Sequence, residues 1–237
     1  MSLINDIVRQ PQGLLAVSAG LVSDAEAVNI FGVNPVVGTT YETLWDYGGA
    51  YAYPSGALAL SAVSSSASDT MPVLIRGLDA NYWPIEEVVT LNGTSAVTTS
   101  KAFLRVNQAV ILSGANVGNI TITNDGTVLA YISIDKGLTQ ACHYTVPVGH
   151  SLYLYRIDIT SGSVNPNKYI TYRNVTRTST GRILRVAEAT WQSDQQSFDR
   201  QVPFRISEKT DFQFEAKSSS GENIVSIFVE GILAKDE

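Results

Sequence analysis

The residues best suited to metal binding lie together in the middle of the chain. Cys142 is the only cysteine, and His143 and His150 are the only histidines. Zinc sites combine thiolate and imidazole ligands. However, Cys142 and His143 are adjacent, and neighbouring residues of a strand point to opposite faces, so both cannot reach one ion. We therefore expect no metal and no cofactor, with Cys142 buried as a structural residue and His150 on an exposed turn.

Glu86 and Glu87 form the only adjacent pair of carboxylates among the predicted strands. Glycosidases use two carboxylates that flank one glycosidic bond. In a strand, these two side chains would point to opposite faces, and we expect one of them to pair with Arg76 or Arg105 across the sheet. No catalytic residue is assigned to this pair.

Motifs of nucleophilic and nucleotide chemistry are missing from the sequence. It contains no G-x-S-x-G nucleophile elbow, and neither G-x-x-x-x-G-K-[ST] nor G-x-G-x-x-G, which cradle phosphates. The sequence therefore predicts a protein that is not an enzyme. A glycan hydrolase is kept only as a third hypothesis, to be tested by cleavage of polysaccharide.

Aromatic residues gather in two glycine-containing stretches, near residues 45–53 and 82–83. Such a composition is shared by carbohydrate-binding surfaces and by subunit interfaces, which are enriched in aromatic side chains. Both readings stay open for these candidate contact residues: Trp45, Tyr47, Tyr51, Tyr53, Tyr82 and Trp83.

Composition favours a β-rich protein. The 237 residues include 16 Lys+Arg and 22 Asp+Glu, a net charge of −6, which argues against nucleic-acid binding through a basic face. Only 16% of residues are charged, whereas 24 Ser and 20 Thr supply much of the polarity, a balance that suits pleated sheets better than exposed helices. No apolar run approaches the ~20 residues of a membrane-spanning helix, so we expect no membrane partner.

Short strands separated by turns begin at residue 41. The segments 73–76 and 85–91 predict a hairpin, as do the strands around Asn124-Asp125-Gly126, and Asn92-Gly93 predicts a tight turn. Two alternating segments predict half-buried strands. In 103–112 we place Leu104, Val106, Gln108, Val110 and Leu112 on the core face; near the C-terminus, Phe212, Phe214 and Ala216 alternate with Asp211, Gln213, Glu215 and Lys217.

These strands predict an all-β, antiparallel β-sandwich or jelly-roll-like fold, because parallel sheets would need long crossovers that the chain lacks. About a dozen strands exceed one small sandwich. We therefore expect two β-domains, 41–137 and 138–237, preceded by an extended N-terminal arm, 1–40. The alternative is that the first forty residues supply the first strands of the fold. The arm must bury its apolar residues on the body or on a neighbouring subunit: Leu3, Ile4, Ile7, Val8, Leu14 and Leu15.

Six blocks carry a resemblance to a known family. They are TLWDYGG (43–49), SSSASDT (64–70), GLDANY (77–82), EVVTLNGT (87–94), FLRVN (103–107) and YTVPVG (144–149). Across roughly residues 40–150, the sequence resembles a family of virion structural proteins from tailed bacteriophages, many of them marine. The family supplies no catalytic residues.

The resemblance implies a non-enzymatic β-protein on a phage virion, made in the host cytoplasm. A capsid decoration or cement protein or a head fibre is our leading hypothesis, and a tail component is also compatible. The partners would be major capsid or tail proteins and further copies of the chain, because particles offer repeated sites; a trimer is one such arrangement. The alternative is a tail-fibre, adaptor or receptor-binding module that contacts host glycans through the aromatic stretches.

Overall fold

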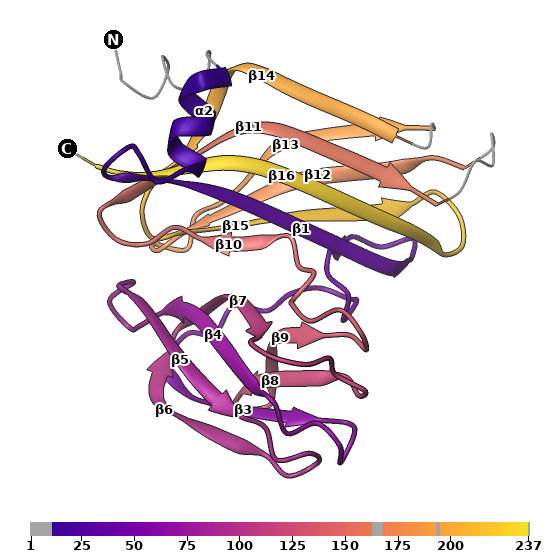
Figure 1. The fold of residues 1–237 in the computed structure, drawn as a ribbon. Coiled ribbons are helices and arrows are strands. Elements are labelled where there is room, and N and C mark those ends of the chain that lie inside the picture. Colours follow the sequence, from indigo (N-terminus) through magenta and orange to yellow (C-terminus); the bar gives the residue numbers. More distant parts are fainter. Residues whose placement is uncertain (1–10, 163–167, 193–194, 237) are drawn as a thin grey trace.

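The computed structural model describes residues 11–162, 168–192 and 195–236. Figure 1 shows two β-sandwiches, a larger one above and a smaller one below. The pairings between the described strands are antiparallel, so the predicted all-β, antiparallel sandwich class is confirmed. Among the described residues, no helix has the length and apolar character needed to cross a membrane.

The larger sandwich combines strands from both ends of the chain. One sheet has the order β1 (Ala25–Val37), β16 (Asn223–Lys235), β11 (His150–Ser161) and β14 (Gln195–Ile206). The facing sheet has the order β10 (His143–Thr145), β15 (Thr210–Ser218), β12 (Ile170–Thr178) and β13 (Ile183–Trp191), with β2 (Glu42–Thr43) beside β15.

The smaller sandwich lies between β2 and β10 in the sequence. Its four-stranded sheet has the order β6 (Val97–Phe103), β3 (Leu58–Ser64), β8 (Ile120–Asn124) and β9 (Thr127–Ile132). Its three-stranded sheet has the order β5 (Pro84–Thr90), β4 (Pro72–Leu78) and β7 (Arg105–Ile111).

Each sandwich has its own hydrophobic core. Phe212, Phe214 and Leu152 are fully buried in the larger one, and Phe103 and Ile75 in the smaller one. The smaller core is built from a continuous stretch of chain, whereas the larger core needs β1 as well as the C-terminal strands. The two sandwiches are therefore nested in the sequence, and the stretch 41–137 also contains β2, which belongs to the larger one.

The prediction of an extended arm is wrong for residues 25–37. They form β1, which pairs with β16 from Ala25 opposite Ala234 to Asn34 opposite Val225. Its inward side chains include Ile30, which joins the larger core. Before β1, the helix α2 (Pro11–Ser18) packs Val17 against Ile232 at the end of the same sheet. Local periodicity could not reveal a pairing between strands about 200 residues apart.

Gly32 marks the close approach of β1 to the facing sheet. A Cβ placed on Gly32 would lie 2.2 Å from the Leu44 carbonyl oxygen and 2.6 Å from Cys142 Cβ. Because a backbone carbonyl cannot move aside freely, we expect Gly32→Ala to lower the free energy of unfolding by about 1–3 kcal/mol, measured by urea denaturation. Gly56→Ala is the control, because a Cβ there meets no atom of the described residues within 4 Å. Equal stability of the two variants would contradict this packing.

Two of the predicted hairpins are confirmed. They are β4–β5 and β8–β9, the second with positive φ at Asp125 and Gly126.

The predicted core face of β7 is partly wrong. Val106 pairs with Gly77 and Gln108 pairs with Arg76, which leaves an extra residue between them. This bulge reverses the alternation, so Ala109 and not Gln108 or Val110 packs in the core, and Leu112 is exposed.

Candidate functional site

A buried ion pair joins the two sandwiches. Arg105 begins β7 in the smaller sandwich, and Asp211 lies on β15 in the larger one. Arg105 Nε donates to Asp211 Oδ1 at 2.8 Å and Nη2 donates to Oδ2 at 3.0 Å, and the two side chains are 8% and 5% exposed. The guanidinium and carboxylate planes therefore meet through two parallel hydrogen bonds, the strongest geometry for this pair.

Neighbouring groups complete the hydrogen bonding of this pair. Arg105 Nη1 donates to the carbonyls of Pro54 at 2.7 Å and Leu104 at 2.9 Å. Thr145 Oγ1 donates to Asp211 Oδ1 at 2.7 Å. The rings of Tyr53 and Tyr82 lie 5.2 and 5.9 Å from the guanidinium carbon. A buried ion pair is stable only when further hydrogen bonds satisfy its remaining donors and acceptors, as these contacts do.

Three further contacts cross between the sandwiches. Asn107 Nδ2 donates to the Thr145 carbonyl at 3.0 Å, and the Thr145 N–H donates back to Asn107 Oδ1 at 2.9 Å. The His143 Nε2 lies 3.2 Å from the Val106 carbonyl. The Tyr53 hydroxyl donates to the Phe212 carbonyl at 3.2 Å. With the ion pair, these bonds fix the two sandwiches against each other.

Arg105 and Asp211 were not predicted to be partners. The sequence pattern predicted that Arg105 or Arg76 pairs with Glu86 or Glu87, and that Asp211 lies on the exposed side of its strand. A single arginine in the otherwise apolar or neutral segment 103–112 was the available signal. The predicted cross-strand ion pair is instead made by Arg76, whose Nε lies 3.4 Å from Glu86 Oε2. Glu87 accepts hydrogen bonds from Ser100 and Lys101.

The six candidate aromatic residues do not form one exposed platform. Trp45 and Tyr51 are only 2% and 6% exposed in the core of the smaller sandwich, so the reading of these two as contact residues is wrong. The rings of Tyr51 and His143 stack with 3.8 Å between centroids. Half-buried Tyr53 and Tyr82 lie at the Arg105 ion pair.

Tyr47 and Trp83 are the two members of the aromatic set that remain well exposed, at 51% and 56%. Tyr47 lies edge-on to Tyr131, with ring centroids 5.3 Å apart. Trp83 follows the turn between β4 and β5. No ring contact joins Tyr47 to Trp83 among the described residues, so each is a separate exposed ring.

The candidate arm residues that the structure describes differ in burial. Leu3, Ile4, Ile7 and Val8 lie outside the described residues. Leu14 packs partly against Val17 and Ile232, whereas Leu15 is exposed.

The sulfur and imidazole side chains occupy structural positions. Cys142 is fully buried in the larger core, and burial raises the pKa of its thiol. His143 faces the smaller sandwich, and His150 is half-buried at the start of β11, with Nδ1 2.9 Å from the Val148 carbonyl. No group of three His, Cys, Asp or Glu residues that could hold a metal ion occurs in the described part of the chain.

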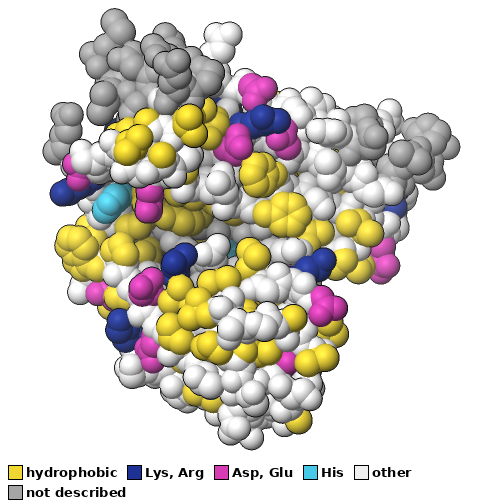
Figure 2. All heavy atoms as spheres, viewed as in Figure 1, with side chains coloured by type: hydrophobic (Ala, Val, Ile, Leu, Met, Phe, Trp, Pro, Cys, Tyr) yellow, Lys and Arg dark blue, Asp and Glu magenta, His cyan; other side chains and the backbone are white. Residues whose placement is uncertain are grey.

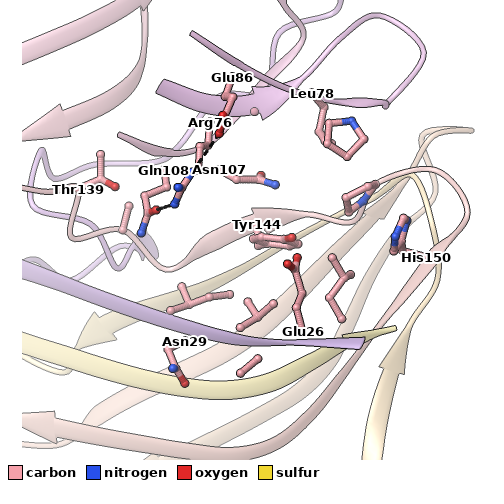
Figure 3. Close-up of a pocket in the computed structure, with 18 of the residues that line it drawn as sticks. Glu26, Asn29, Arg76, Leu78, Glu86, Asn107, Gln108, Thr139, Tyr144 and His150 are labelled. Carbon is pink, nitrogen blue, oxygen red and sulfur yellow. Dashed lines mark hydrogen bonds and ion pairs between the residues drawn. The ribbon is translucent and has the colours of Figure 1, made fainter. Parts of the chain in front are cut away.

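A groove of about 1050 Å³ runs between the sandwiches, beside β1. Figure 2 shows the hollow, with hydrophobic side chains gathered around it. In Figure 3, Glu26 of β1 points towards Tyr144, and Arg76 on the opposite wall is held by Glu86 and Gln108. Burial and the Glu26 carboxylate both raise the pKa of the Tyr144 hydroxyl, which therefore stays protonated. Three carboxylates line the groove: Glu86 pairs with Arg76, Asp24 Oδ1 lies 3.8 Å from Lys235 Nζ, and Glu26 has no ion-pair partner among the described residues.

Comparisons with known proteins do not identify a family for this chain. No family model matches the chain, and no curated protein matches it. Solved structures that align with it include the infectious bursal disease virus VP2 subviral particle, at 8% identity and a TM-score of 0.22, covering 91% of this chain and 78% of that chain. The Gx strain of the same virus aligns at 10% identity and a TM-score of 0.23, covering 90% and 76%. These are viral particle structures, but similarity this weak establishes neither a shared fold nor a shared function.

Proposed function

We propose that the chain is a non-enzymatic structural protein of a virus particle, and more specifically of a tailed-phage virion. In this proposal it decorates or cements the capsid or forms a head fibre, and it contacts major capsid or tail proteins and further copies of itself. The observation that carries the proposal is the location of the resembling blocks. Their side chains build turns, cores and the junction between the sandwiches.

Block 64–70 illustrates this structural role. Asp69 is fully buried and accepts hydrogen bonds from Ser64 Oγ at 2.5 Å and from the N–H groups of Val117 and Gly118 at 2.9 and 3.0 Å. Burial raises the pKa of the Asp69 carboxyl, but these hydrogen bonds outweigh it and leave the pKa below its ordinary value. Asp69 therefore stays ionised and ties two loops together.

The other blocks have comparable roles. Asp79 Oδ1 accepts from the N–H groups of Asn81 and Trp83 at 2.8 and 2.9 Å, which shapes the β4–β5 turn. Trp45 Nε1 donates to the Gly49 carbonyl at 3.1 Å from within the core. Arg105, in another block, forms the buried ion pair. A resemblance carried by such residues favours a shared architecture over a shared reaction.

Exposed edges support association. β13 and β14 are edge strands of the larger sandwich, and apolar Ile183, Leu184 and Val202 on them are exposed. Unpaired strand edges with apolar side chains are places where further protein can pack. This agrees with self-assembly or attachment to a particle.

The experiment that tests the proposal locates the chain in intact particles. We expect its density, or a label fused to it, at regularly repeated positions on the capsid or tail, and a mass in solution that is a multiple of the 25.5 kDa chain. Absence from purified particles would contradict the proposal, and cleavage of polysaccharide by the purified protein would contradict the non-enzymatic reading.

A receptor-binding role in the tail is the second candidate. The Trp83 side chain is exposed, and its backbone N–H is held by Asp79 Oδ1 in the β4–β5 turn. If Trp83 stacks on host glycans, Trp83→Ala is expected to weaken binding to host cells or a glycan array about tenfold, which corresponds to ~1.4 kcal/mol. Tyr47→Ala is the matched control, since Tyr47 is equally exposed but packs against Tyr131. Unchanged binding by Trp83→Ala would remove this ring from the candidate site.

A further inference from the structure

One edge of β1 carries unpaired backbone groups. β16 pairs with the other edge, and the Lys235 N–H donates to the Asp24 carbonyl at 2.8 Å. The Val33 N–H, by contrast, points away from β16 towards the Gln140 carbonyl, 3.5 Å away. Backbone groups alternate between the two edges along a strand. The groups that point away from β16 therefore belong to Ala25, Ala27, Asn29 and Phe31.

These backbone groups face the groove between the sandwiches. Residues 24–31 line it along its length. Within the described part of the chain, no backbone hydrogen bond reaches Ala27, Asn29 or Phe31 from that side. The groove is therefore a sheet edge that is open to one more strand, at the usual spacing of about 4.8 Å.

The walls of the groove decide what can fill this edge. Tyr144 and Pro147 of the larger sandwich and Leu78 and Ile85 of the smaller one also line it. Because residues of the smaller sandwich line the same groove as β1, the space beside β1 is bounded by that sandwich. A single extended segment fits such a space, held by main-chain hydrogen bonds with alternate side chains in the groove.

We propose that residues 2–10 of a second copy of this chain bind along β1 as an added antiparallel or parallel strand. The proposal rests on the assembly role proposed above, and it names the surface and the segment through which two copies connect.

The composition of residues 2–10 suits this groove. The segment SLINDIVRQ contains Leu3, Ile4, Ile7 and Val8, and β-branched residues favour strands. Nine extended residues span roughly 30 Å, comparable to the roughly 26 Å of the eight residues 24–31. Arg9 adds a positive charge, and Glu26 in the groove has no ion-pair partner among the described residues.

The orientation of α2 favours a second copy of the chain, and not the same chain, as the source of the bound segment. Val17, near the C-terminal end of α2, packs on Ile232, and the helix leads from there to β1. In Figure 1, the first residues of α2 lie at the end of the helix away from β1 and the groove. Residues 2–10 would have to return along the ~12 Å of α2 to reach the groove of their own chain.

Disulfide trapping with the full chain tests the proposal. Cys142 is fully buried, so background reactivity is low. Asn5→Cys and Asp6→Cys place a thiol on either face of the segment, and each is mixed with Ala27→Cys under mild oxidation. We expect a disulfide-linked dimer, seen on a non-reducing gel, for at least one of the two mixtures.

Variants at Asn29 test the strand pairing itself. Asn29→Pro removes an N–H that points into the groove without removing a bond to β16, and edge strands tolerate proline there. In the Ala27→Cys chain it should reduce trapping at least fivefold, whereas Asn29→Asp, which keeps the N–H, should not. Thermal unfolding checks that both variants fold.

Other outcomes would overturn the inference. No trapping in either mixture contradicts it, as does trapping that Asn29→Pro leaves unchanged. A disulfide within one chain in the Asn5→Cys/Ala27→Cys double variant, without dimers in the mixtures, assigns the groove to the chain's own segment. Particle incorporation is measured separately: a chain that joins particles but is not trapped keeps the proposed function and loses this inference.

Discussion

Asp211→Ala is expected to lower the free energy of unfolding by about 3–5 kcal/mol, the usual result of leaving one member of a buried ion pair without its partner. The Arg105 guanidinium would remain in the junction, 8% exposed, with neither of its two carboxylate bonds. Urea denaturation followed by tryptophan fluorescence measures the change, because Trp45 reports on the smaller core and Trp191 on the larger one.

Two comparisons isolate the buried pair. Glu86→Ala breaks the Arg76–Glu86 pair, whose side chains are 54% and 64% exposed, and should cost less than about 1 kcal/mol. The double variant Arg105→Met/Asp211→Leu removes both charges and should recover much of the stability lost in Asp211→Ala. If Asp211→Ala were no more destabilising than Glu86→Ala, the pair would not hold the sandwiches together.

Local sequence patterns predicted the strands and turns better than their partners. In β15, the alternation correctly placed Phe212, Phe214 and Ala216 in the core. It also placed Asp211 and Gln213 in solvent, yet both are buried, Asp211 at the junction with the smaller sandwich. Alternation identifies one buried face of a strand, but it carries no information about a second domain that covers the other face.

The candidate site shows the same limit. The contact between Arg105 and Asp211 joins residues 106 positions apart, and the pairing of β1 with β16 joins the two ends of the chain. A bulge such as the one in β7 also changes the face of every later residue, although the sequence there continues to alternate. The features that could be predicted depend on residues within about ten positions of each other in the sequence. The junction and the groove depend on contacts between residues much farther apart, so they could not be predicted.

The contribution of His143 to the stability of the protein is expected to fall as the pH drops from about 6.5 to 4. This imidazole is 4% exposed, stacks on Tyr51, and has no hydrogen-bond partner at Nδ1 among the described residues. Burial lowers the pKa of His143 to about 4, and its hydrogen bond with the Val106 carbonyl opposes this only partly. The unfolded chain, with an ordinary pKa near 6.5, binds the proton first, so acid favours unfolding by up to roughly 3 kcal/mol below pH 4.

His143→Gln separates this effect from other titrating groups. The glutamine amide can donate to the Val106 carbonyl but does not ionise. Burial raises the pKa of Asp46 to about 6, which stabilises the folded state as the pH falls and so opposes His143. The difference in unfolding free energy between wild type and variant cancels this contribution, because both proteins contain Asp46. We expect that difference to shrink or reverse between pH 6.5 and 4; a difference that stays constant over this range would show that His143 is protonated at its ordinary pKa in the folded protein.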